Sequence, residues 1–274
     1  MTAPHRPDAS GVLAALLEAR TGQRLASDRS WRIDVTLGPL LRELAVGTLD
    51  QLVQRLLGGA DPSLGDRIVD ALLNQESSFF RDTSVFDLIG QAIAELPAGR
   101  RARIWSAGCA AGQEPLSLAM LLAEQAGAPE FEILATDVSE GALARARAGR
   151  FTQFEIQRGL PIRRMMRWFD AADPDWVARP DLVRRLTFRR VNLVADAPPP
   201  GRFDLVTCRN VLLYLAPAAR GAVFDRLAAA LRPGGLLVLG AGETVIGQTD
   251  AFTPSTRYRG LYEVTEPQSR RVAA

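Results

Sequence analysis

The sequence lacks lysine entirely and has a single histidine and two cysteines among its 274 residues. All 33 basic residues are therefore arginine, which we attribute to a coding bias rather than to 33 separate functional needs. Cys109 and Cys208 have no metal-ligand spacing, so a protein of the reducing cytoplasm is expected. Because His5 lies in the N-terminal tail, neither a metal site nor histidine-based catalysis is expected.

Long hydrophobic runs are also lacking. No apolar run approaches the roughly 20 residues that span a bilayer, and the N-terminus has no signal-peptide hydrophobic region, so membrane insertion is not expected. The net charge of +2 is too small to indicate a nucleic-acid-binding protein. A hydrophobic content of 47% is typical of a globular protein, and the length allows two domains.

Amphipathic helices dominate the first part of the chain. Apolar residues at helical spacing predict helices over about residues 10–22, 30–44, 48–57, 64–73 and 85–96. We expect an all-helical N-terminal domain over residues 10–84 and a second domain over residues 85–266.

The second domain begins with a strand, a glycine turn and a helix. In residues 103–120, RIWSAGCAAGQEPLSLAM, an apolar run precedes Gly108 and Gly112, and Pro115 lies in the first turn of an apolar helix. This order is typical of the first crossover of a doubly wound α/β sheet, whose ligand binds beyond the carboxyl ends of the strands.

Two carboxylates near this turn indicate the ligand. The spacing Gly108-x-x-x-Gly112 differs from the glycine pattern that binds a pyrophosphate, and Glu114 would repel one. A carboxylate there suits an amino group or a sulfonium, and S-adenosylmethionine carries both. Asp137 ends the next predicted strand, where it can accept both ribose hydroxyls of an adenosine. The alternative is an ordinary turn with Asp137 capping a helix.

Further strands are predicted over residues 186–191, 203–208 and 236–239, with an edge strand over 258–264 and helices over 141–148 and 218–231. The motif from Arg232 to Gly235 is expected to end the second of these helices. Residues 151–185 form an arginine-rich insert. Nine arginines face four aspartates between positions 158 and 190, which predicts a basic surface.

Six segments together resemble the chemotaxis receptor methyltransferases, the CheR family. In order they are QESSFFRD, IWSAGCAAGQEP, LATDVSEGALARARAGRF, VNL, FDLVTCRNVLLYL and LRPGGLLVLGAGET. The N-terminal part resembles that family's helical domain, so the resemblance covers nearly the whole chain. It implies an α/β fold with a Rossmann-like methyltransferase sheet, a small all-helical N-terminal domain and a small insert subdomain. It also implies methyl transfer from S-adenosyl-L-methionine to receptor glutamates, giving γ-glutamyl methyl esters and S-adenosyl-L-homocysteine.

The resemblance implies cofactor contacts at Gln75, Ser77, Arg81, Glu114, Asp137, Asn192, Leu193, Arg209 and Asn210. The family commonly has Asn and Thr at the first two positions, and these replacements keep hydrogen-bonding groups. The family's turn usually has Ser-Thr and two Glu, whereas here residues 110–114 read AAGQE. Hydroxyls and one charge are lost, but Glu114 is kept.

The implied chemistry needs no general base, because the side chain of an acceptor glutamate has an ordinary pKa of about 4.3 and is ionised at neutral pH. The protein must remove water from this carboxylate and align it with the sulfonium methyl. Arg81 is a catalytic candidate that can pair with the acceptor or with the cofactor's own carboxylate. Tyr214 is the candidate for an acceptor-orienting hydroxyl, and a packed aromatic is its alternative.

Glutamate-rich cytoplasmic helices of chemoreceptors are the expected partners of a monomeric protein. They would meet opposite charge at Arg20, Arg24, Arg29 and Arg32 and over residues 158–190, although these charges could also be a solvated face. The insert has no glycine-rich hairpin loop between positions 168 and 186. Recognition independent of a C-terminal receptor peptide is therefore expected.

Two other functions stay open. One is a methyltransferase of the same fold that acts on a small molecule or nucleic acid. The other is a non-catalytic signalling adaptor that binds S-adenosylmethionine or its product, which the altered turn at Ala110 and Ala111 would permit.

Overall fold

The computed structural model describes residues 8–25, 31–97 and 99–265, and it divides into two compact units. Within these residues, unit 1 takes those up to Asn74 together with Tyr214–Ala219, and unit 2 takes the rest. The domain limits 10–84, 85–266 and the insert limits 151–185 stay sequence predictions. In the described ranges, no helix is long and apolar enough to cross a bilayer.

Unit 1 contains helices α1 (Ala9–Thr21), α2 (Trp31–Glu43), α3 (Leu49–Leu57) and α4 (Leu64–Leu72), at the positions that the apolar spacing predicts. The Asp8 carboxylate accepts a hydrogen bond from the Gly11 N–H at 2.7 Å and so caps α1. Gly22, with φ of 73°, ends it. His5, Arg29 and the Arg32 side chain lie outside the described residues.

A distant segment of the chain completes unit 1. The Tyr214 carbonyl accepts a hydrogen bond from the Arg24 N–H at 2.8 Å, and the Ala216 N–H donates to the Gly22 carbonyl at 3.0 Å. Tyr214 ends the short 3-10 helix η2 (Leu212–Tyr214) and is partly buried. Residues 214–219 therefore supply backbone partners to the end of α1 that the nearby sequence does not provide.

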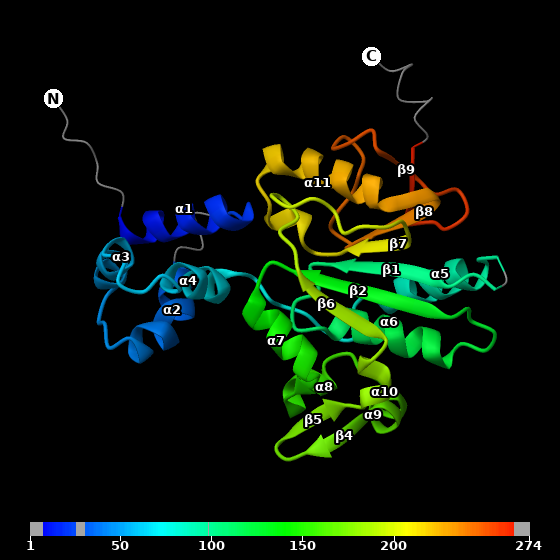
Figure 1. The fold of residues 1–274 in the computed structure, drawn as a ribbon, viewed down its shortest axis with the longest axis horizontal. Helices are drawn as coiled ribbons and strands as arrows, with labels where there is room; N and C mark the ends of the chain where they lie inside the picture. Colours follow the sequence, from blue (N-terminus) through cyan, green and yellow to red (C-terminus); the bar gives the residue numbers. More distant parts are fainter. Residues whose placement is uncertain (1–7, 26–30, 98, 266–274) are drawn as a thin grey trace. The chain divides into compact units, whose positions relative to one another are not determined.

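Unit 2 is built on a seven-stranded sheet in the order β6-β2-β1-β7-β8-β10-β9 (Figure 1). The first five strands are parallel to one another, and β10 pairs antiparallel with both β8 and β9. This confirms the predicted Rossmann-like α/β fold. The strands are β1 (Ala102–Ala107), β2 (Phe131–Asp137), β6 (Leu186–Arg190), β7 (Phe203–Cys208), β8 (Leu231–Leu239), β9 (Phe252–Pro254) and β10 (Tyr262–Val264).

Buried apolar side chains hold helices against this sheet. The helices are α5 (Thr83–Ala94), α6 (Gln113–Glu124), α7 (Glu140–Ala148) and α11 (Pro217–Ala230). Trp105 of β1 is fully buried, and its indole N–H donates to the Thr136 hydroxyl at 2.9 Å. A buried indole without such a partner would be costly, so this bond helps to fix β1 against β2.

The arginine-rich insert forms α8 (Gln153–Gln157), α9 (Ile162–Trp168), α10 (Pro180–Val183) and the three-stranded sheet β3-β5-β4. These strands are β3 (Arg150–Phe151), β4 (Phe169–Ala172) and β5 (Asp175–Ala178). The ring of Phe79 packs edge-on against Phe151 and Phe169, with centroids 5.1 and 5.6 Å away. Residues 79–82, here called the FFRD motif, are thereby joined to the insert.

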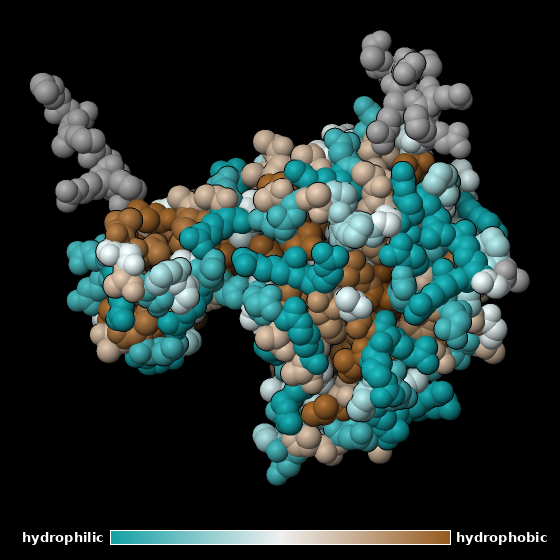
Figure 2. Space-filling model, viewed as in Figure 1, coloured by the Kyte–Doolittle hydropathy of each residue, from teal (hydrophilic) through white to brown (hydrophobic). Residues whose placement is uncertain are grey.

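Hydrophilic side chains cover much of the face in Figure 2, with brown patches among them. In the insert, Phe154, Ile162 and Met166 are exposed apolar side chains. Single exposed apolar residues are normal on a soluble surface and need no partner to explain them.

Two strand predictions are wrong. The strand predicted at the edge is β10, which lies between β8 and β9, and the three-residue β9 forms the edge instead. The 232–235 motif does not separate helix from strand, because β8 already begins at Leu231. Between Leu231 and Leu236 the pairing of β8 with β7 changes register. Gly234 lies in this irregular part of β8 and has φ of 72°, which glycine adopts without strain.

Tyr258 provides a test of stability at alkaline pH. Burial, and then a short hydrogen bond to the Glu95 carboxylate, raise the pKa of Tyr258 to about 12. The phenol stays neutral in the folded protein above pH 10, where it ionises in the unfolded chain. Its contribution to stability is therefore complete below pH 10 and is lost as the pH rises towards 12.

We expect the free energy of unfolding to fall between pH 10 and 12, by up to about 1.4 kcal/mol per pH unit from this group. Tyr258→Phe should reduce that slope, whereas Tyr262→Phe, at a partly buried residue, serves as the control. Urea denaturation at several pH values measures it, and equal slopes for wild type and Tyr258→Phe would contradict the assignment. The lack of lysine leaves few other side chains to titrate in this range.

Candidate functional site

The glycine turn after β1 lies at the carboxyl edge of the parallel strands. The N–H groups of Gly108 and Cys109 donate to the Thr136 carbonyl of β2 at 2.8 and 2.9 Å. Gly108 has φ of 81°, and a Cβ on it would lie 2.4 Å from the Val211 side chain. Only glycine fits this position, where the turn closely approaches the segment that follows β7.

Asp137, at the end of β2, is held in one orientation by two backbone groups. One carboxylate oxygen accepts from the Ala110 N–H at 2.8 Å and the other from the Ser139 N–H at 3.0 Å. Ser139 caps α7 and accepts a hydrogen bond from the Gln75 amide at 3.2 Å. Asp137 is half-buried and thus joins the turn, α7 and the segment that begins at Gln75.

Glu114, in the first turn of α6, is largely buried. One of its oxygens accepts from the hydroxyls of Ser106 and Thr207 at 2.7 and 2.5 Å, and the other pairs with Arg209 at 3.4 Å. Only 14% of its side chain is exposed. These three partners, which the sequence did not predict, fix Glu114 between the ends of β1 and β7.

Arg209 connects the elements of this edge. Its side chain is 3% exposed, and one guanidinium nitrogen donates to both the Arg81 carbonyl and the Asp82 carboxylate at 2.7 Å. With its bond to Glu114, it joins the end of β7 to α6 and to the FFRD motif. Buried between these partners, Arg209 is placed to position them. Its contact with the cofactor stays a prediction from the sequence.

Glu243 is a residue of this edge whose role the sequence did not indicate. One of its oxygens accepts from the N–H groups of Asn210 and Gly240 at 2.7 and 2.9 Å. The other accepts from those of Val211 and Leu213 at 3.0 and 3.2 Å. A single carboxylate thus holds the backbone after β7 against the end of β8.

Strained backbone gathers in the same segments. Among the described residues, Phe80, Asp82, Ala110 and Asn210 have φ between 46° and 58°, a conformation that side chains other than glycine rarely adopt. Ala45 of unit 1 is the fifth. Such strain persists only where surrounding contacts enforce it, and it concentrates at functional sites.

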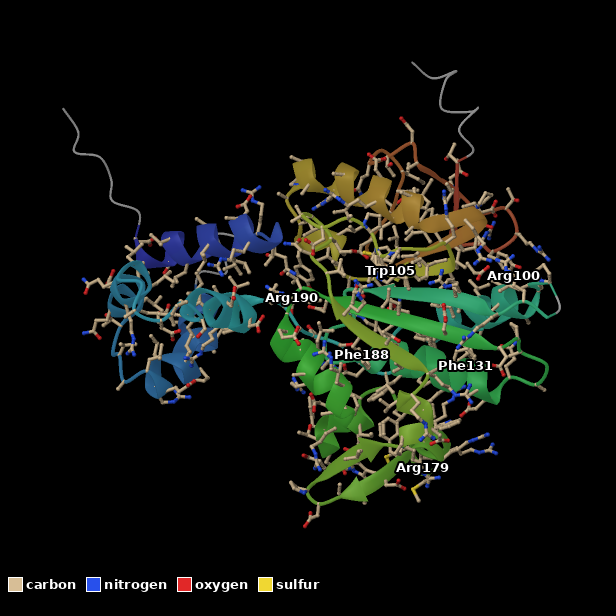
Figure 3. All side chains as sticks on the ribbon, in the orientation of Figure 1. Arg100, Trp105, Phe131, Arg179, Phe188 and Arg190 are labelled. Carbon is tan, nitrogen blue, oxygen red and sulfur yellow. The ribbon has the colours of Figure 1, made fainter. Side chains whose placement is uncertain are left out.

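Asn192 and Leu193 follow β6 at this edge. The Asn192 side-chain oxygen accepts from the N–H groups of Val194 and Ala195 at 3.0 and 3.3 Å, which shapes its own turn. Figure 3 shows Arg190, the last residue of β6, at the opposite end of the sheet from Arg100. Tyr214 belongs to unit 1 and is not among the residues that unit 2 brings together.

A surface cavity of ≈ 380 Å³ lies beside the turn. Gln75 and Ser77 line it together with Ala111 and Gln113 of the turn, whereas Glu114 and Asp137 do not. The other lining residues are Glu76, Arg145, Thr152, Phe154, Glu155 and Arg158. The structure thus places two of the predicted cofactor residues in this cavity and others at the strand ends.

Cys109 is not a nucleophile candidate. Burial, and then the charges of Asp137 and Glu114, raise the pKa of its thiol well above the usual value. The thiol stays neutral, and a neutral thiol is unreactive.

The donor and acceptor groups at this edge fit S-adenosylmethionine. The side-chain oxygens of Asn210 and Gln113 are buried and have no hydrogen-bond partner among the described residues, which suits a ligand with hydroxyl or amino donors. The carboxylate of Asp137 is fixed at a strand end, where ribose hydroxyls bind in related folds.

Comparisons with known proteins agree with these features. Residues 75–260 match the family model described as CheR methyltransferase, SAM binding domain. The chain is 35% identical over 258 residues to chemotaxis protein methyltransferase 1 of Pseudomonas aeruginosa, covering 88% of this chain and 92% of that one. It is 35% identical over 244 residues to chemotaxis protein methyltransferase 1 of Vibrio cholerae, covering 86% and 89%. The chain therefore belongs to the CheR family of S-adenosylmethionine-dependent methyltransferases.

Proposed function

We propose that the protein methylates glutamate side chains on the cytoplasmic helices of chemoreceptors and so forms γ-glutamyl methyl esters. The observation that supports this most is the Arg209 network, because it joins the FFRD motif, Glu114 and the end of β7. Each of these segments carries the resemblance to the CheR family. The names of the two relatives, both chemotaxis protein methyltransferases, support the same acceptor.

Within this proposal, three of the predicted residues have a distinct role toward the cofactor or the acceptor. Asp137 accepts the ribose hydroxyls, Glu114 faces the amino end of the cofactor, and Arg81 binds its carboxylate or the acceptor. The backbone and side chains that complete the site are those of Gln75, Ser77, Asn192, Leu193, Arg209 and Asn210. When bound, the cofactor supplies an electrophilic methyl group.

The protein itself needs to orient and desolvate rather than to move a proton. The acceptor carboxylate is ionised at neutral pH, so no side chain of the protein would need to remove a proton before its oxygen could take the methyl group from the bound cofactor. Arg81 would hold this carboxylate through a charge-assisted pair. The acceptor-orienting role of the Tyr214 hydroxyl stays a prediction from the sequence. Fixed neighbours such as Glu114 and Asn210 need no rearrangement, because Arg209 and Glu243 already hold them.

Two measurements test the proposal. Calorimetry with S-adenosylhomocysteine should give saturable binding, and receptor-containing membranes with radiolabelled cofactor should become labelled. The label should be released by base as volatile methanol, as expected for a carboxyl ester. Membranes without receptors are the control and should stay unlabelled.

Other outcomes separate the alternatives. Binding without transfer would replace the proposal by a signalling adaptor. Transfer that resists base would exclude a glutamyl ester, and transfer only to small molecules would exclude the receptor as acceptor.

A further inference from the structure

A second cavity lies at the opposite end of the sheet from the glycine turn. It has a volume of ≈ 140 Å³. Arg100 precedes β1, Asp204 is the second residue of β7, and Arg232 is the second residue of β8. Because these strands are parallel, the three residues lie at their amino ends, and Figure 3 shows Arg100 at this side.

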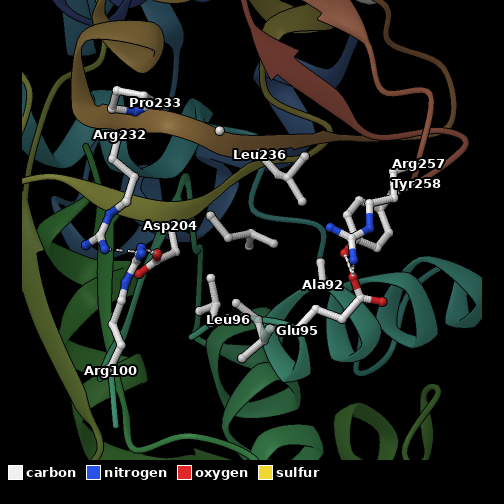
Figure 4. A pocket seen from close by; sticks show the side chains of 13 residues that line it. Ala92, Glu95, Leu96, Arg100, Asp204, Arg232, Pro233, Leu236, Arg257 and Tyr258 are labelled. Carbon is white, nitrogen blue, oxygen red and sulfur yellow. Dashed lines mark hydrogen bonds and ion pairs between the residues drawn. The ribbon is translucent and has the colours of Figure 1, made fainter. Parts of the chain in front are cut away.

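The charges at one end of this cavity are unequal. Arg100 and Arg232 both pair with the same oxygen of Asp204 (Figure 4). The Arg232 guanidinium lies 3.1 Å from this oxygen. The other oxygen of Asp204 accepts from the Arg103 N–H at 2.9 Å. Two guanidinium groups therefore share one carboxylate that is 3% exposed. Within the described ranges, one positive charge at this end is left without a counterion.

The two arginines also keep unused donors. The Nε atoms of Arg100 and Arg232 are buried and have no hydrogen-bond partner among the described residues. Burial lowers the pKa of Arg100, and the neighbouring charge of Arg232 lowers it further. Excess charge held in a partly buried place is costly unless an anion balances it.

Apolar and balanced groups line the rest of the cavity. Figure 4 shows Leu96 and Leu236 between the Arg100 end and the end formed by Arg257 and Glu95, which are themselves an ion pair. The excess positive charge is therefore confined to the Arg100 end. An engineered cavity of about 150 Å³ takes up a benzene molecule, so the space suffices for a small ligand.

We propose that this cavity binds a small oxyanion, phosphate or carboxylate, between Arg100 and Arg232, with any apolar part of the ligand against Leu96 and Leu236. Guanidinium groups bind both anions through paired N–H donors. This site is separate from the carboxyl edge, where Asp137 and Glu114 are acidic. The ligand would not compete with the cofactor.

The test is a titration of the full chain with inorganic phosphate and, separately, with benzoate, at constant ionic strength. Calorimetry should give saturable binding of at least one of them, with millimolar or lower Kd. Arg232→Gln should weaken it at least tenfold, because the remaining Arg100 is then balanced by Asp204. Saturation with S-adenosylhomocysteine should leave it unchanged.

Arg101→Gln is the matched control, because Arg101 is exposed and pairs with Glu132 outside the cavity. It should bind the anion as the wild type does. Amide chemical shifts of the wild-type protein add a readout that does not depend on the variant folding: Leu96, Gly234 and Tyr258 should shift on titration. No saturable binding, equal binding by Arg232→Gln, or shifts confined to other residues would overturn the proposal.

Discussion

Replacing Asp137 by asparagine should weaken S-adenosylhomocysteine binding about 100-fold. The carboxylate is fixed by Ala110 and Ser139, so asparagine keeps the shape but turns one oxygen into a donor. Hydrogen bonds to charged groups contribute roughly 1.5–3 kcal/mol each. A loss of about 3 kcal/mol corresponds to the expected factor, since 1.4 kcal/mol is tenfold. Calorimetry measures it.

The control for this variant is Asp225→Asn, which makes the same chemical change at an exposed position of α11. It should bind as the wild type does. Since the backbone bonds of Asp137 also support the turn, unfolding must be followed in parallel. If Asp137→Asn stays folded and binds with wild-type affinity, Asp137 does not hold the ribose.

Replacing Glu243 by glutamine should lower the free energy of unfolding by about 3 kcal/mol. Glutamine places an NH₂ group against two of the four N–H donors, so two charge-assisted bonds are lost and their donors are left unpaired. Urea denaturation measures the change. Hydrogen exchange should also accelerate at the amides of Val211 and Leu213, because their bonds to Glu243 are the longer two of the four.

Glu140→Gln is the matched control. Glu140 forms an exposed ion pair with Arg147, and such pairs contribute roughly 0–1 kcal/mol. A Glu243→Gln variant that was no less stable than Glu140→Gln would show that the four N–H groups find water or other acceptors instead.

Local patterns were sufficient to predict most of unit 2. The glycine turn, the strand that ends at Asp137 and the capped helix α7 depend on neighbours in the sequence, and all three are present. The edge strand was predicted wrongly because strand order depends on pairing between distant segments. Nothing local in Phe252–Pro254 indicates that it pairs outside β10.

The connections within the site were beyond prediction for a similar reason. Arg209 and Asp82 are 127 positions apart, and Glu243 bonds to residues about 30 positions earlier. Residue type shows that a carboxylate is present, but only the fold shows which N–H groups it meets. Glu243 carried a signal, since a carboxylate directly after a glycine-rich strand end has backbone donors nearby, but that signal is weak.

The completion of unit 1 by Tyr214–Ala219 affects the order in which the protein can mature. On the ribosome, unit 1 must wait for 145 residues after Asn74 (219 minus 74) before its last segment, Tyr214–Ala219, is complete. At about 5–20 residues per second, that delay is roughly 7–29 seconds. During this time the amino-terminal helices are incomplete, so a nascent chain stalled before position 214 is a natural target for chaperones and proteases.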